Sequence, residues 1–80
     1  MQANLASSFD LVLFVGLMDI GTKIRTARVH RGWTVVDLAE KLGVTRQCVE
    51  SWESGKTAPR AQRVTKVAKV LGLEPAALLP

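Results

Sequence analysis

The chain has 80 residues, a formal net charge of +4 and an apolar fraction of 48%. This length suits one small domain, so a second hydrophobic core, a large substrate pocket and wholesale disorder are not expected. All 11 lysines and arginines lie after Met18. A compact basic domain is typical of polyanion binding, although basic surfaces of this size also occur without any ligand.

Cysteine and histidine usage narrows the chemistry. Cys48 is the single cysteine, which excludes an internal disulfide, and no cluster of cysteine and histidine could hold zinc or iron. We therefore expect no metal, no cofactor and a reducing, cytoplasmic environment. The apolar run at 11–18 has no basic flank and is well short of the roughly 20 residues that span a bilayer, so we expect no membrane association.

Residues 1–17 differ in composition from the rest of the chain. They contain no basic residue, and a polar start is followed by the run Leu-Val-Leu-Phe-Val. We interpret 1–17 as an N-terminal appendage of uncertain structure and 18–80 as the folded domain. Four interpretations of the appendage stay open: an upstream start codon ahead of a natural start at Met18, a frayed tail, a strand that pairs across a dimer, and an extra packed helix.

The pattern after Met18 predicts short helices and no strand. A first helix begins near Ile20 and ends near Gly32, because side chains of one face recur there at spacings of three and four. A second helix lies between Thr34, which can cap its start, and Gly43, which can close it. The apolar face of this second helix contains Val35, Leu38, Ala39 and Leu42.

A third helix follows directly after a tight turn at Gly43. Thr45 can cap it, Gly55 can end it, and Val49 and Trp52 form its apolar face. Two short capped helices joined by a glycine turn form an arrangement that lets the second of them project into a DNA groove.

The remaining residues predict two further helices. The clearest apolar stripe of the chain, closed by Gly72, consists of Val64, Val67, Ala68 and Leu71. A short fifth helix with Pro75 in its first turn is expected over 74–79. About sixty residues in short helices are near the lower limit for independent folding, so dimerisation is expected to contribute to stability.

These residues resemble the phage repressor and Cro type of helix-turn-helix regulators, the XRE-like family with an all-α, lambda-repressor-like fold of five helices. The similarity covers Ile20 to Leu79. The matching elements are Ile24-Arg25, Arg28, Arg31-Gly32-Trp33-Thr34, Asp37-Leu38-Ala39, Leu42-Gly43-Val44-Thr45, Val49, Trp52-Glu53-x-Gly55, Pro59 and Ala68-x-x-Leu71-Gly72-Leu73. The resemblance implies double-stranded DNA as the partner, a homodimer, and a partly buried structural ion pair between Arg28 and Glu53.

Two small residues have a direct physical reason in such a domain. Ala39 is small because the third helix must cross the second helix closely, and a larger side chain would push the pair apart. Gly43 supplies the positive φ of the turn at low steric cost.

The polar side of the third helix is expected to read base edges, because it avoids the side that bears Val49 and Trp52. Arg46 can make a bidentate contact to guanine, Gln47 can pair with adenine, and Glu50 can accept from cytosine or orient Arg46. The alternative for these side chains is a solvated helix surface. The candidates for base reading are Arg46, Gln47, Cys48, Glu50 and Ser51.

Contacts to the phosphate backbone are expected at helix ends and in the loop after the third helix. Arg60 could also reach into a minor groove, whereas Lys66 and Lys69 fit a solvated helix face better. The candidates for backbone contact are Thr34, Thr45, Ser54, Lys56, Thr57 and Arg60.

One position departs from the family pattern. Members commonly have a DNA-contacting glutamine immediately after the residue equivalent to Thr34, whereas this chain has Val35, followed by a second apolar residue, Val36. The departure weakens the expectation of DNA contacts from the start of the second helix and leaves open a surface for a protein partner.

No arrangement typical of catalysis is visible, and His30 has no carboxylate or serine at a recognisable spacing, so we expect no enzyme. The predicted function is sequence-specific transcriptional regulation, as a repressor that binds a pseudo-palindromic operator as a dimer. The alternatives are an antitoxin or a restriction-modification controller with the same fold, and a protein interaction module.

Overall fold

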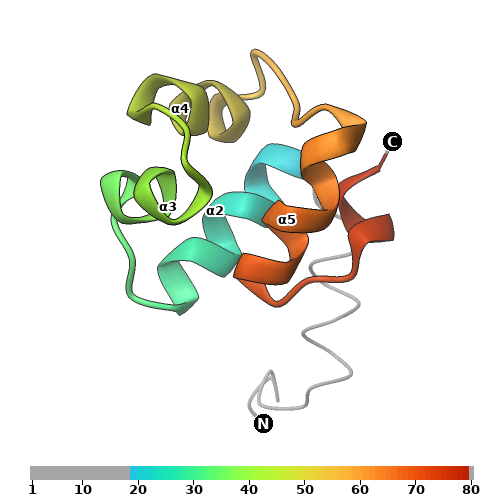
Figure 1. The fold of residues 1–80 in the computed structure, drawn as a ribbon, viewed down its shortest axis with the longest axis horizontal. Coiled ribbons are helices and arrows are strands. Elements are labelled where there is room, and N and C mark those ends of the chain that lie inside the picture. The colour runs from blue at the N-terminus through green and yellow to red at the C-terminus, as the bar shows by residue number, and fades with distance from the viewer. Residues whose placement is uncertain (1–18, 80) are drawn as a thin grey trace, which may run out of the picture.

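The computed structural model describes residues 19–79, which form four α-helices and one short 3-10 helix (Figure 1). These elements are α2 (Ile20–His30), α3 (Val35–Leu42), α4 (Arg46–Ser54), α5 (Ala61–Leu71) and η1 (Pro75–Leu78). Over this range the chain contains no strand, as expected for an all-α fold. The interpretations of residues 1–17 concern a segment outside the described residues.

The predicted helix caps are confirmed. The Thr34 side chain accepts from the backbone N–H of Asp37 at 3.0 Å, and the Asp37 carboxylate accepts from the backbone N–H of Thr34 at 2.9 Å, a complete capping box. Thr45 caps α4 by accepting from Cys48 N–H at 3.1 Å. The helices end in left-handed glycines, with φ of 71° at Gly43 and 87° at Gly55.

The aspartates at helix starts have lowered pKa values. The backbone N–H of Thr34 donates to Asp37, and this hydrogen bond lowers the pKa of the carboxyl group because it favours the charged form. Asp19 caps α2 by accepting from Thr22 N–H at 2.8 Å, and its pKa is lowered for the same reason. Since both pKa values are lowered, these caps contribute stability above the unfolded-state pKa, and that contribution is lost as the pH falls through the folded-state value.

The helices enclose one hydrophobic core. In Figure 1, α3 and α4 lie on one side of the molecule and α5 and η1 on the other, with α2 between them. The stripes predicted from the sequence meet in the interior. The buried core residues are Ile24, Leu38, Ala39, Leu42, Val49, Trp52, Val64, Val67, Ala68, Leu71 and Leu78. Because α4 packs against both α2 and α3, its apolar side is covered and its opposite side faces outward.

The predicted short fifth helix is present as η1, a 3-10 helix of four residues and not a fifth α-helix. The backbone N–H of Ala77 donates to the carbonyl of Glu74 at 2.9 Å, a spacing of three residues. Pro75 contributes no N–H, and a segment this short does not offset the cost of nucleating an α-helix. Leu78 is nevertheless buried in the core, and the Nζ of Lys23 on α2 donates to Ala77 O at 2.8 Å.

Gly21 allows α2 to start directly on the last turn of α4. A Cβ atom at this position would lie within 2.9 Å of the carbonyl oxygen of Glu53 and would also meet the carbonyl oxygen of Trp52. Both obstacles are backbone atoms, so they cannot move aside as a flexible side chain would. This contact determines how closely the two helices approach, and no local pattern in the sequence indicates it.

We expect Gly21→Ala to destabilise the domain by about 1 to 3 kcal/mol, because the added methyl group overpacks the α2–α4 contact. Helix propensity alone would give the opposite sign, since alanine is favoured over glycine within a helix by about 1 kcal/mol. The free energy of unfolding in urea distinguishes the two effects. Val29→Ala on the exposed side of α2 is the control, and a stabilised Gly21→Ala variant would contradict the close contact.

Candidate nucleic-acid interface

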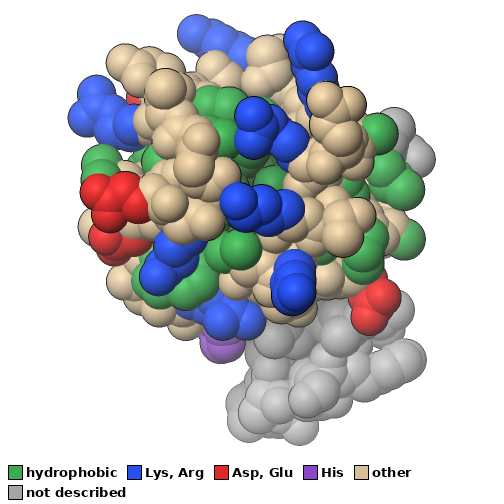
Figure 2. All heavy atoms as spheres, viewed as in Figure 1, with side chains coloured by type: hydrophobic (Ala, Val, Ile, Leu, Met, Phe, Trp, Pro, Cys, Tyr) green, Lys and Arg blue, Asp and Glu red, His purple; other side chains and the backbone are tan. Residues whose placement is uncertain are grey.

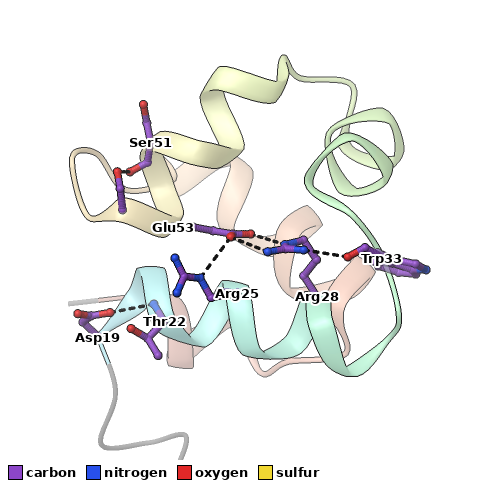
Figure 3. Close-up of polar contacts among 8 residues, drawn as sticks. Asp19, Thr22, Arg25, Arg28, Trp33, Ser51 and Glu53 are labelled. Atoms are coloured by element: carbon purple, nitrogen blue, oxygen red, sulfur yellow. Dashed lines mark hydrogen bonds and ion pairs between the residues drawn. The ribbon is translucent and has the colours of Figure 1, made fainter.

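An ion pair between Arg28 and Glu53 joins α2 to the last turn of α4 (Figure 3). Arg28 Nε donates to Glu53 Oε2 at 2.6 Å and Nη2 donates to Oε1 at 2.9 Å, which is a bidentate contact. The side chains are only 13% and 6% exposed. The hydrogen bonds to Glu53 raise the pKa of Arg28, so the guanidinium stays charged. The pair implied by the family resemblance is present in the structure.

Arg28 also fixes the loop that leads into α3. Its Nη1 donates to the carbonyl oxygen of Trp33 at 2.9 Å, and Arg25 Nε lies 3.7 Å from Glu53 Oε1 (Figure 3). No buried side-chain nitrogen or oxygen in residues 19–79 lacks a hydrogen-bond partner. One guanidinium therefore holds α2, the loop before α3 and α4 in a defined arrangement.

A second connection runs from this loop to α5. Two cations lie over the Trp33 ring, with Lys41 Nζ 4.6 Å and the Arg31 guanidinium 5.4 Å from its centroid. Arg31 Nε also donates to the carbonyl oxygen of Leu71 at 3.1 Å, at the end of α5. Arg31 was predicted only as part of a motif, since no spacing signal links it to a residue forty positions later.

The candidates for base reading on α4 fall into two groups that differ in solvent exposure. Arg46, Gln47 and Glu50 are exposed. Cys48 and Ser51 are half-buried, and Cys48 packs against the core. The Ser51 carbonyl also accepts the backbone N–H groups of Lys56 and Thr57, at 3.0 and 3.3 Å, which fixes the loop after α4.

The exposed group contains a further ion pair. Arg46 Nε lies 3.5 Å from Glu50 Oε2 at a spacing of four residues, and the two side chains are 59% and 51% exposed. Val49 and Trp52 lie beneath them with 0% and 3% exposure. The helix therefore presents charged and amide groups outward from an apolar base.

All candidates for phosphate contact are solvent-exposed: Thr34, Thr45, Ser54, Lys56, Thr57 and Arg60. The hydroxyl oxygens of Thr34 and Thr45 accept capping bonds, so each hydroxyl proton can still be donated to a phosphate oxygen. Arg60 is the N-cap residue of α5 but makes no side-chain capping bond. Figure 2 shows further lysine and arginine side chains gathered across the face of the molecule that includes α5.

The departure at Val35 has a structural reason. Val35 is half-buried and packs against the core, so an apolar residue stabilises the first turn of α3. Val36 points away from the core with 45% of its surface exposed, and His30 is exposed at the end of α2. Val36 is thus the apolar residue at the start of α3 that a partner could contact.

The described part of the chain contains no metal centre and no membrane-spanning helix. Between residues 19 and 79 no group of three histidine, cysteine, aspartate or glutamate side chains could hold a metal ion. No helix in that range is long and apolar enough to cross a bilayer.

We expect Glu53→Ala to lower the free energy of unfolding by about 3 to 5 kcal/mol, because Arg28 would remain largely buried without its counter-charge. Urea denaturation measures this loss. Glu50→Ala, an exposed acid on the same helix, is the matched control and should change stability by less than about 0.5 kcal/mol. In the double variant Arg28→Ala with Glu53→Ala the loss should be smaller than the sum of the single losses, and simple additivity would contradict the pairing.

Comparison with known proteins identifies the family. A helix-turn-helix family model matches residues 24–78. An uncharacterized HTH-type transcriptional regulator of Methanothermobacter thermautotrophicus is 40% identical over 53 residues, which cover 66% of this chain and 77% of that protein. The solved structure of the P22 c2 repressor in complex with a synthetic operator has a TM-score of 0.73 at 26% identity, covering 78% of this chain and 94% of that chain. SinR, the master regulator for biofilm formation, in complex with DNA has a TM-score of 0.68 at 35% identity, covering 76% of this chain and 98% of that chain.

The chain spans 49%, 39% and 38% of the lengths of three other curated relatives, so the match to them is confined to one part of each protein. The family model covers more than half of the present chain, and the helix-turn-helix seen at α3 and α4 falls within the matched residues. The chain therefore belongs to the XRE-type helix-turn-helix family, the phage repressor type that its sequence resembles.

Proposed function

We propose that this chain is a sequence-specific DNA-binding transcriptional regulator that acts in the cytoplasm as a repressor, by binding a pseudo-palindromic operator as a homodimer. One observation carries the proposal. The exposed side chains Arg46, Gln47 and Glu50 stand on the buried residues Val49 and Trp52, and α4 is held in that orientation by the Arg28–Glu53 pair. An outward polar helix on a rigid apolar base can enter a major groove without a rearrangement of the domain.

Base recognition follows from the chemistry of the exposed side chains. The Arg46 guanidinium can donate two hydrogen bonds to O6 and N7 of guanine, and the Gln47 amide can pair with N6 and N7 of adenine. Ser51 and Cys48 lie at the half-buried edges of α4, where Ser51 can hydrogen-bond a base or phosphate and Cys48 can contact a thymine methyl group. On this assignment Arg46 and Gln47 are the main base-reading residues of α4, and Ser51 and Cys48 make additional contacts at its edges.

Backbone contacts would position the helix in the groove. Thr34 and Thr45 place hydroxyl donors at the starts of α3 and α4, where the exposed backbone N–H groups also favour anions. Lys56, Thr57 and Arg60 belong to the loop between α4 and α5, on the other side of the reading helix. Contacts on both sides would fix the register of α4 without selecting a sequence.

The homodimer is proposed from the length of the reading helix. A single α4 of nine residues can contact only one short stretch of bases, so a twofold arrangement is needed to lengthen the site. In such complexes half-sites lie about 34 to 36 Å apart, one turn of DNA. The similar P22 c2 repressor is described in complex with an operator, and SinR in complex with DNA, which supports DNA as the partner here.

A protein partner is the second candidate, and the exposure of Val36 favours it. This side chain is 45% exposed at the start of α3, next to Val35, which stands where the family pattern provides a DNA-contacting glutamine. An antitoxin, a restriction-modification controller or an interaction module would use such an apolar contact. Loss of partner binding in Val36→Ser with unchanged DNA affinity would assign the residue to that role.

We expect fragments selected from random DNA by the purified chain to share a symmetric motif, and we expect Arg46→Ala with Gln47→Ala to abolish the selection. The double variant Gln62→Ala with Lys66→Ala, which removes an amide and a cation from exposed positions of α5, should keep the motif. Sequencing of the bound pool and a gel-shift titration measure the two outcomes. A pool without enrichment for the unaltered chain would refute sequence-specific binding.

We also expect the affinity for the selected site to fall steeply with salt, since each neutralised phosphate contributes a slope of about −0.9 in log K against log salt. Lys56→Ala and Arg60→Ala should each make this slope shallower by about 1. Lys69→Ala on the solvated side of α5 should leave it unchanged. Fluorescence anisotropy over a salt series provides the measurement, and equal slopes for all variants would place the phosphate contacts elsewhere.

A further inference from the structure

The charges of α4 run in the opposite direction to those that stabilise a helix. Arg46 is the first residue of α4, its first turn contains no acid, and Glu50 lies four residues later. A helix N-terminus carries a partial positive charge, so a cation there is unfavourable, and an acid preceding a base by four is the better order. Arg46 and Glu50 have the reverse order, since the base precedes the acid by four residues.

The neighbouring α3 has the favourable order. Its first turn contains Asp37, which closes the capping box, and its last turn contains Lys41. The two helices differ in this respect although both have a threonine N-cap and a left-handed glycine at the end. Helix stability therefore accounts for the charges of α3 but not for those of α4.

The exposure of the α4 pair leads to the same conclusion. The Arg46 and Glu50 side chains are 59% and 51% exposed, and ion pairs in water contribute little to folding. The closest approach uses Arg46 Nε, so the two Nη groups of that guanidinium still carry four donors. Two of these donors are sufficient for O6 and N7 of a guanine.

We propose that Glu50 is a specificity-determining positioning residue that holds Arg46 for guanine and withholds it from phosphates. This inference rests on the proposed function and adds a mechanism to it. Without Glu50, the flexible Arg46 side chain can contact any phosphate, which raises affinity for all DNA alike. Glu50 directs the Arg46 guanidinium along α4 and so reduces its contact with phosphates. Guanine offers two acceptors in the major groove, so it is the base that best replaces the lost phosphate contacts.

The Glu50 carboxylate has a second effect on the choice of base. It accepts hydrogen bonds but donates none, so it is repelled by the phosphates and can bind a base only at a donor group. The N4 amino group of cytosine is the major-groove donor that suits it in a G·C pair. The Arg46–Glu50 ion pair therefore lowers the affinity for non-specific sites and favours a G·C base pair next to α4.

The experiment compares Glu50→Gln with Glu40→Gln. Both substitutions remove one negative charge from an exposed side chain, but Glu40 lies on α3 and forms no ion pair within residues 19–79. Each variant is titrated with the duplex selected by the unaltered chain, with the same duplex altered at its most strongly selected guanine, and with a scrambled duplex. The guanine preference is the ratio of the affinity for the selected duplex to the affinity for the duplex altered at its guanine.

We expect Glu50→Gln to bind the scrambled duplex more tightly and to lose about tenfold of the guanine preference. Glu40→Gln should bind every duplex slightly more tightly and keep the preference. In an Arg46→Gln background, Glu50→Gln should change the guanine preference far less, because the side chain that Glu50 positions is gone and only its own contact with cytosine is lost. The melting temperature of Glu50→Gln should stay unchanged, which a purely structural role would not allow.

Three results would overturn the inference in distinguishable ways. If the unaltered chain selects a motif and Glu50→Gln keeps its full guanine preference, the positioning role is wrong and the proposed function stands. If the unaltered chain selects no motif, both proposals fail together. A lower melting temperature with an equal loss of affinity for all duplexes would assign Glu50 to the scaffold and likewise contradict the positioning role.

Discussion

The last turn of α4 is held from three directions, and the Arg28–Glu53 ion pair is the interaction on which this arrangement depends. Trp52 is buried in the core, the adjacent Glu53 accepts two hydrogen bonds from Arg28, and the carbonyl groups of both residues rest on Gly21. A buried pair is weak evidence for net stability, because desolvation offsets much of the attraction. Its effect is instead to make one orientation of α4 much more favourable than any other, since rotation of the helix would separate two largely buried charges.

Because α4 is anchored at its C-terminal turn, the exposed side chains at its N-terminal end project from the domain into solvent. Arg46 and Gln47 begin the helix immediately after the turn at Gly43 and the cap at Thr45. That turn spans only residues 43–45, and Gly43 adopts a left-handed conformation there, φ 71°, that a side chain would disfavour. The loop before α3 is fixed by the same Arg28 and by the stacking of Arg31 and Lys41 on Trp33. The candidate interface is therefore a rigid surface formed by locally capped elements.

Features that depend on residues close in the chain were predictable, and those that depend on distant residues were not. The threonine caps, the left-handed glycines and the apolar stripes follow from spacings of three or four residues, and the structure has them where the sequence indicated. The contact of Gly21 with the carbonyl groups of α4 and the bond from Arg31 to Leu71 O join segments more than thirty residues apart, for which one sequence has no signal. The Arg28–Glu53 pair was expected only through resemblance to a family. The type of η1 was missed because a helix-like composition over four residues does not determine the hydrogen-bond spacing.

An arginine–glutamate ion pair is present at each end of α4, but the two pairs have different effects because they differ in solvent exposure. Arg28 and Glu53 are 13% and 6% exposed, so separating them is costly and the pair behaves as a fixed joint. Arg46 and Glu50 are 59% and 51% exposed, so water and salt screen their attraction and the pair contributes little to folding. Its contact uses Arg46 Nε, so the Nη donors stay accessible to a base, whereas the guanidinium of the buried pair is occupied within the domain. Burial thus assigns one pair to the scaffold and leaves the other available to respond to DNA, although the two are built from the same side chains.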